Sequence, residues 1–148
     1  MCRHCSFVFD ADGNPVAPTV WQTDTNQEGK WLNQITFINK QVEVVINDIL
    51  SKSETPPIII LQGDHGFRFY SLDDPMEERL RRSFEELNAL YLPAGGNAAV
   101  YESISSINTF RVIFNFYFDA NLELLPDDSY YPPSFDNFFS LVDVTRQF

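Results

Sequence analysis

An acidic and an imidazole side chain stand next to each other at a position where metal chemistry is possible. Asp64 and His65 follow the apolar run 58–61 and are flanked by Gly63 and Gly66. Carboxylate oxygens and imidazole nitrogens are ligands of Zn²⁺ and Mn²⁺. Adjacent side chains of a regular strand point to opposite faces, so the two reach one ion only where the backbone turns, which glycine permits. The pattern predicts a metal site, with a plain polar turn as the alternative.

The elements that would hold this turn can be read from the apolar spacing. The run 58–61 has no polar alternation, which is typical of a strand buried on both faces in a parallel sheet. Residues 27–51 repeat apolar side chains at three- and four-residue steps, which predicts an amphipathic helix, and Thr25 and Glu28 before it have capping-box spacing. Similar signals predict a strand at 7–9, a helix at 75–86, and strands at 89–92 and 141–145. A further helix is predicted to begin at Ser103, Ser105 or Ser106 and to carry Ile107, Phe110, Ile113, Phe114 and Tyr117.

Alternating strands and helices predict an α/β fold with a layered, mostly parallel sheet flanked by helices. The 148 residues suit a single domain, residues 1–148. The chain holds 14 Phe, 6 Tyr and 2 Trp, which is a large aromatic content for this length. The richest stretch is predicted to form core, and comprises Phe110, Phe114, Phe116, Tyr117 and Phe118.

Charge and composition narrow the function classes. The formal net charge is −11, which argues against nucleic acid or an anionic membrane surface as partners. Apolar runs are too short for a membrane span in this chain, and residues 1–5 lack the apolar stretch of a signal peptide. Cys2 and Cys5 are the only cysteines, too few for a disulfide framework or a four-ligand zinc site.

Four stretches resemble, in order along the chain, segments of one enzyme family. They are His4–Asp10, Pro57–Gly66, Asn88–Pro93 and Ser106–Arg111. They are similar to the His-x-Pro segment, the strand ending in Asp-His-Gly, the strand after it and the Ser-x-Val-Asn-Thr-Phe-Arg helix of the sulfatase-like branch of the alkaline phosphatase superfamily, which includes lipoteichoic acid synthases. The resemblance implies an alkaline-phosphatase-like fold, of which this chain is the C-terminal portion.

The resemblance also implies a mechanism and a location. In the family a metal-activated Thr, Ser or formylglycine attacks a phosphate or sulfate ester and forms a covalent intermediate. On that basis Asp64 and His65 hold a divalent metal (Mn, Zn, Ca or Mg), and His4 contacts the anionic group of the ester substrate. Family members of this branch commonly place the domain outside the cytoplasm behind membrane helices, which implies an extracytoplasmic domain of a membrane protein.

The chain lacks several motifs of the family, and these differences lead to the prediction of an inactive fragment. The family nucleophile and another acidic metal ligand precede the His-x-Pro segment, no Cys-x-(Pro/Ser)-x-Arg signature occurs, and Cys5-Ser6 replaces the proline. We therefore expect a C-terminal fragment of a metal-dependent phosphate- or sulfate-ester hydrolase or transferase, inactive alone. Its partner would be the missing N-terminal half or, through exposed strand edges, another copy of itself. The alternative is a non-catalytic acidic binding or scaffold module.

Overall fold

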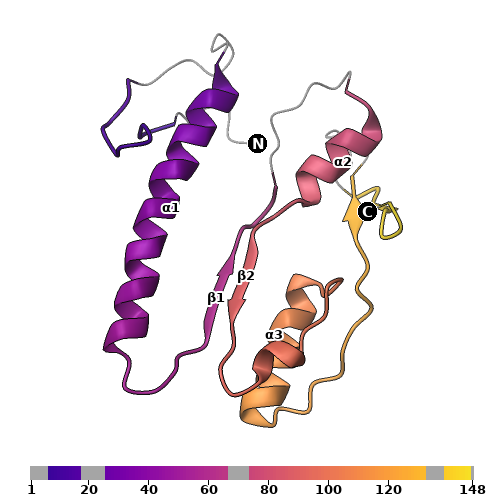
Figure 1. The fold of residues 1–148 in the computed structure, drawn as a ribbon. Coiled ribbons are helices and arrows are strands. Elements are labelled where there is room, and N and C mark those ends of the chain that lie inside the picture. The colour runs from indigo at the N-terminus through magenta and orange to yellow at the C-terminus, as the bar shows by residue number, and fades with distance from the viewer. Residues whose placement is uncertain (1–6, 18–25, 67–73, 133–138, 148) are drawn as a thin grey trace. The chain divides into compact units, whose positions relative to one another are not determined.

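The structure is a computed structural model that describes residues 7–17, 26–66, 74–132 and 139–147. The chain forms two compact units, Met1–Pro56 and Pro57–Phe148, which are described separately (Figure 1). Helices and strands both occur, so the α/β class is confirmed at this coarse level. The single domain over residues 1–148 stays a prediction.

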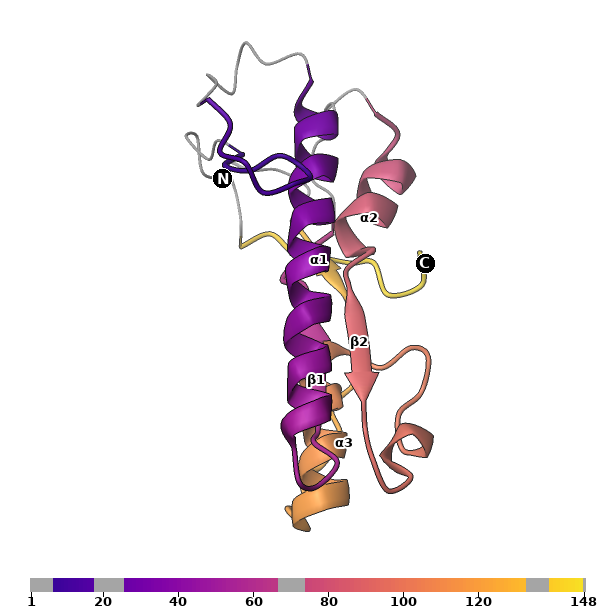
Figure 2. The same cartoon turned by 60° about the vertical axis from the view of Figure 1, so that its left-hand side comes forward.

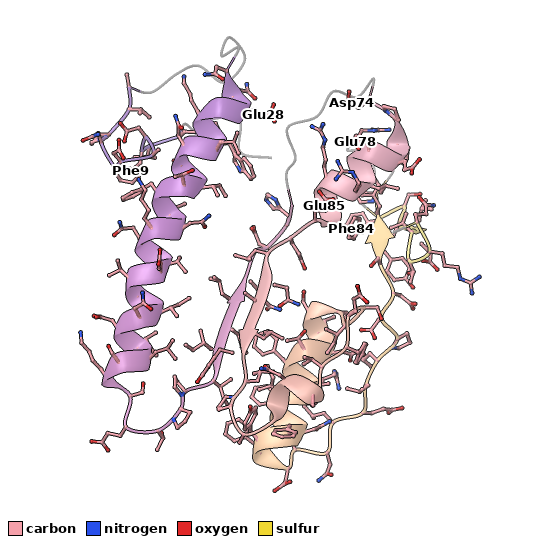
Figure 3. The ribbon with its side chains drawn as sticks, viewed as in Figure 1. Phe9, Glu28, Asp74, Glu78, Phe84 and Glu85 are labelled. Carbon is pink, nitrogen blue, oxygen red and sulfur yellow. The ribbon has the colours of Figure 1, made fainter. Side chains whose placement is uncertain are left out.

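The first unit contains the long helix α1 (Gln27–Lys52) and a preceding loop. The helix agrees with the predicted 27–51, while Thr25 of the predicted capping box lies outside the described residues. The loop packs on the helix through the rings of Phe9 and Phe37, whose centroids are 5.1 Å apart, and Figure 3 labels Phe9 beside α1. The predicted strand at 7–9 is reduced to one bridge between Phe9 and Pro15.

The second unit is organised around two paired strands, β1 (Ile59–Gln62) and β2 (Asn88–Tyr91). They are antiparallel, with Ile59 opposite Tyr91 and Gln62 opposite Asn88, so the predicted parallel pairing is wrong for this pair. The strands are also half-buried or exposed rather than buried on both faces. The reason lies in the connection, because it returns the chain to the end of β1 at which it left.

That connection contains α2 (Met76–Phe84), which lies at the end of the strand pair where β1 finishes and β2 begins (Figures 1 and 2). Leu80 of α2 is buried together with Tyr131 and Val144, and Phe84 packs against this cluster. Tyr131 belongs to β3 (Tyr130–Tyr131), which pairs antiparallel with β4 (Val142–Asp143). A small apolar core therefore fixes α2 to the C-terminal strands.

The chain continues from β2 through the 3-10 turn η2 (Gly96–Ala98) into α3 (Ser106–Phe118). The buried face of α3 consists of Asn108, Thr109, Val112 and Ile113. Phe110, Phe114, Phe116 and Phe118 are exposed, so the prediction that this aromatic run forms core is wrong. The inward face is instead the one whose polar side chains bind the segment after the helix, as described below.

Candidate metal site at the end of β1

The predicted metal ligands lie in a short turn that two backbone hydrogen bonds hold in place. Gly63 N–H donates to the Leu87 carbonyl over 2.8 Å, and Gly66 N–H donates to the Ser83 carbonyl over 2.9 Å. Asp64 and His65 lie between these two attachment points. The turn is therefore fastened at both ends to the segment that joins α2 to β2.

Gly66 is required by close packing and not by backbone freedom. Neither Gly63 nor Gly66 has a positive φ, so the sequence argument that the glycines permit an unusual turn is wrong here. A β carbon at position 66 would collide with the carbonyl oxygens of Arg82 and Glu85. A β carbon at position 63 would lie 3.5 Å from the Leu87 nitrogen, which is an ordinary contact.

The Asp64 and His65 side chains converge. His65 Nε2 lies 3.7 Å from Asp64 Oδ2. Bonds from zinc to nitrogen and oxygen ligands are about 2.0–2.2 Å long, so atoms at this separation can both reach one ion with an open angle between the bonds. The exposed fractions are 92% for the Asp64 side chain and 41% for that of His65, so a cation has access from solvent.

The second ring nitrogen of His65 is already occupied. Nδ1 lies 2.7 Å from the Gly66 carbonyl oxygen. A carbonyl can only accept, so Nδ1 carries the proton and Nε2, in the neutral ring, keeps its lone pair. Metal-binding histidines are usually oriented in this way by a hydrogen bond from the other nitrogen. The ring is therefore oriented to offer Nε2 on the side of Asp64.

The electrostatic surroundings suit a cation at the turn. The carbonyl end of α2 meets Gly66, and the C-terminal end of a helix carries partial negative charge. Two arginines of α2 form ion pairs with neighbouring carboxylates, because Glu78 binds Arg81 at 2.8 Å and Arg82 at 2.5 Å, and Arg81 also binds Glu85. Hydrogen bonds from Arg81 and Arg82 lower the pKa of Glu78 to about 2. Figure 3 labels Glu78 and Glu85 along this helix.

The described residues supply two ligands and no more. They contain no group of three or more His, Cys, Asp or Glu side chains that could hold a metal ion. Catalytic zinc sites have three protein ligands and structural ones four. His4, predicted to contact the substrate's anionic group, lies outside the described residues, as do Cys2 and Cys5.

A second polar cluster, around Asn108 and Asp127, was not predicted from the sequence. Asn108 Nδ2 donates to the Leu125 carbonyl at 2.6 Å and to Asp127 Oδ1 at 2.8 Å, and its Oδ1 accepts from Leu125 N–H at 3.0 Å. Asp127 also accepts from Ser105 N–H at 2.7 Å and from the Tyr101 hydroxyl at 2.5 Å. Every polar group of Asn108 is thus used within the protein.

The Asp127 carboxylate is held ionised by these donors. Its partial burial alone would raise its pKa, but the hydrogen bonds from Ser105, Tyr101 and Asn108 outweigh burial and lower the pKa to about 2. Asn108 lies in the first turn of α3, where its backbone N–H donates to the Ser105 side chain at 3.3 Å, so no local sequence pattern singles it out. Its partners lie 17 to 19 residues away, beyond the reach of local patterns.

Comparisons with protein-family models, curated proteins and solved structures find no match to this chain. Among the helices in the described part of the chain, none combines the length and the apolar character that crossing a bilayer requires.

Proposed function

We propose that this chain forms part of a metal-dependent phosphate- or sulfate-ester hydrolase or transferase of the sulfatase-like class. Asp64 and His65 would be two ligands of its divalent cation. The observation that carries the proposal is the 3.7 Å separation of Asp64 Oδ2 and His65 Nε2. The hydrogen bond from Nδ1 to Gly66 supports it, because that bond leaves Nε2 as the ligand atom.

Asp64, His65 and His4 would each have a distinct role in this reaction. A bound cation acts as a Lewis acid on an ester oxygen and favours a deprotonated nucleophile. Asp64 supplies negative charge to the cation, and His65 supplies a borderline nitrogen ligand, which favours Zn²⁺ or Mn²⁺ over Mg²⁺ or Ca²⁺. His4 would contact the anionic group of the substrate, where an imidazolium stabilises negative charge. Sulfate and phosphate esters are equally compatible with this assignment.

The nucleophile and the remaining metal ligands would come from a partner, namely the missing N-terminal half of the domain, and this chain alone would not turn over substrate. Two observations support a partner. The described residues offer two metal ligands, and their β1–β2 sheet has only two strands, so each strand has an outer edge without a partner strand there. Further strands parallel to β1 would build the larger alkaline-phosphatase-like sheet, in an extracytoplasmic domain. Self-association through the same edges is the competing arrangement.

The test is a Mn²⁺ titration of the 148-residue chain, followed by NMR. Paramagnetic broadening that is strongest at the amides of residues 63–66 is expected in the wild type and should be lost in Asp64→Asn. Glu77→Gln is the matched control, since Glu77 is an exposed carboxylate on neighbouring α2, and this variant should keep the broadening. A wild-type chain indifferent to Mn²⁺ and Zn²⁺ would contradict the proposal and favour the non-catalytic acidic binding module.

A further inference from the structure

Gly66 connects the end of α2 to the His65 ring through its own peptide groups. Its N–H donates to the Ser83 carbonyl at 2.9 Å, and its carbonyl accepts from His65 Nδ1 at 2.7 Å. A displacement of the last turn of α2 would therefore move the Gly66 carbonyl and rotate the imidazole that bonds to it.

The contact is also as close as two backbones allow. The position of a β carbon at residue 66 is filled by the carbonyl oxygens of Arg82 and Glu85, with that of Ser83 next to them. Only glycine fits, since any larger residue must push the turn away from the helix. The turn and the last turn of α2 consequently behave as one packed unit.

The other side of α2 is anchored in the core. Leu80 is buried with Tyr131 and Val144, and the ring of Phe84 lies 6.4 Å from that of Tyr131. Backbone hydrogen bonds continue past the helix end, from Glu85 N–H to the Arg81 carbonyl. The core thus fixes α2, α2 fixes Gly66, and Gly66 orients His65.

We propose that Gly66 and the C-terminal turn of α2 position the cation ligands Asp64 and His65, and that cation binding in turn stabilises this end of α2. This inference rests on the metal site proposed above. The coupling runs in both directions, because two linked equilibria must affect each other equally. The partial negative charge at the helix end adds to the coupling, since a cation at the turn offsets it.

The first experiment compares Mn²⁺ affinity in Gly66→Ala and Gly63→Ala. Residues that orient a metal ligand change affinity by about 10–100-fold when altered, and we expect a loss of that size in Gly66→Ala. Gly63→Ala adds the same methyl group to the same turn, where it makes only ordinary van der Waals contacts, so its affinity should stay within about twofold of wild type. Circular dichroism in the far ultraviolet establishes that both variants are folded. Equal affinity in the two variants would overturn the inference.

The second experiment needs no variant, so it holds even if Gly66→Ala fails to fold. Hydrogen exchange of wild-type protein is followed by mass spectrometry with and without Mn²⁺. Peptides covering 76–86 should exchange more slowly with Mn²⁺, and those of α1 should not change. If Mn²⁺ binds at residues 63–66 and exchange in 76–86 is unaffected, the inference fails while the proposed function stands. If Mn²⁺ does not bind to the wild type, both fail.

Discussion

Asp64 and Asp127 are both carboxylates of the second unit, and the protein treats them in opposite ways. Asp127 accepts hydrogen bonds from Ser105, Tyr101 and Asn108. Asp64 has 92% of its side chain exposed and faces an imidazole nitrogen 3.7 Å away. A carboxylate whose acceptor positions are filled by protein donors holds the fold together. One that is left open beside an oriented imidazole is available to a ligand.

The difference extends to what surrounds each group. The Asp127 cluster fastens the segment after α3 to that helix, with Arg111 Nη1 donating to the Glu123 carbonyl at 2.7 Å and Asn115 pairing with the Leu122 backbone. The Asp64 turn is attached to the end of α2 and to the segment between α2 and β2 by backbone hydrogen bonds, and while His65 Nδ1 bonds to the Gly66 carbonyl, the Asp64 carboxylate and His65 Nε2 face each other at 3.7 Å. A polar cluster is therefore a better candidate for ligand binding when its donors and acceptors are not used within the protein, whatever the number of polar residues in it.

The largest expected effect tests the structural side of this comparison. Asn108→Ala removes a fully buried side chain and its hydrogen bonds to the Leu125 backbone and to Asp127, and should lower the free energy of unfolding by about 1–3 kcal/mol. Asn115→Ala removes the same kind of two-way pairing at a half-buried site and should cost about 1 kcal/mol or less. Urea unfolding of both variants measures the difference. Equal losses would contradict a special role for burial at Asn108.

An intermediate effect concerns pH. The pKa of Asp127 is lowered from 3.8 to about 2 in the folded protein. A carboxylate lowered in this way stabilises the fold above its unfolded pKa, and the contribution is lost as the pH falls from about 4 towards 2. Tyr101→Phe removes one donor, so it should destabilise the protein at pH 7, by less than Asn108→Ala does, and this loss should become much smaller as the pH falls from about 4 towards 2.

Tyr130→Phe is the control for that measurement. The Tyr130 hydroxyl meets Asp128, the neighbour of Asp127, over a longer 3.4 Å. Its removal should therefore change stability less at pH 7. The comparison would break if Tyr101→Phe cost the same at pH 2 as at pH 7, since the hydroxyl would then act independently of the ionised carboxylate.

The smallest effect is expected at the candidate site itself. Asp64→Asn should leave the free energy of unfolding nearly unchanged, because surface substitutions outside buried networks have little effect. Asp127→Asn, measured beside it by thermal unfolding, should be clearly less stable than wild type at pH 7. A marked destabilisation by Asp64→Asn without added metal would show that the turn carboxylate is structural after all.

The helices could be predicted because their apolar spacing repeats over many residues. The predicted range 27–51 agrees with α1, and 75–86 contains α2. The positions of β1, β2 and β4 also followed from short apolar runs, whereas β3 was not predicted and the run 7–9 forms only one bridge. A run of four residues also carries no information on its pairing direction. That direction depends on how the chain returns through α2. The prediction of which face of α3 is buried was wrong, because Asn108 and Thr109 are buried and the phenylalanines are exposed.

At the candidate site, too, features that depend on neighbours in the sequence could be predicted, and features that depend on distant residues could not. The positions of Asp64 and His65 after β1 could be predicted, since they depend on neighbours in the sequence. The reason for Gly66 was explained wrongly, because the carbonyl groups that it approaches lie at the end of α2, 16 to 19 residues away. Asp127 was missed for the same reason. The structural role of each of these residues depends on contacts with segments that are distant in the sequence, which a local pattern does not contain.

Residues 122–125 form no helix or strand, and yet side chains of α3 donate hydrogen bonds to the backbone carbonyls of Leu122, Glu123 and Leu125. A peptidase must draw several residues of its substrate into an extended conformation with free carbonyls. The carbonyls of Leu122, Glu123 and Leu125 already accept hydrogen bonds, so a chymotrypsin-like enzyme, which cleaves after leucine, should leave this stretch intact although it is exposed and irregular. Resistance to digestion would here come from hydrogen bonds of asparagine and arginine side chains, in place of the backbone hydrogen bonds of a helix or sheet.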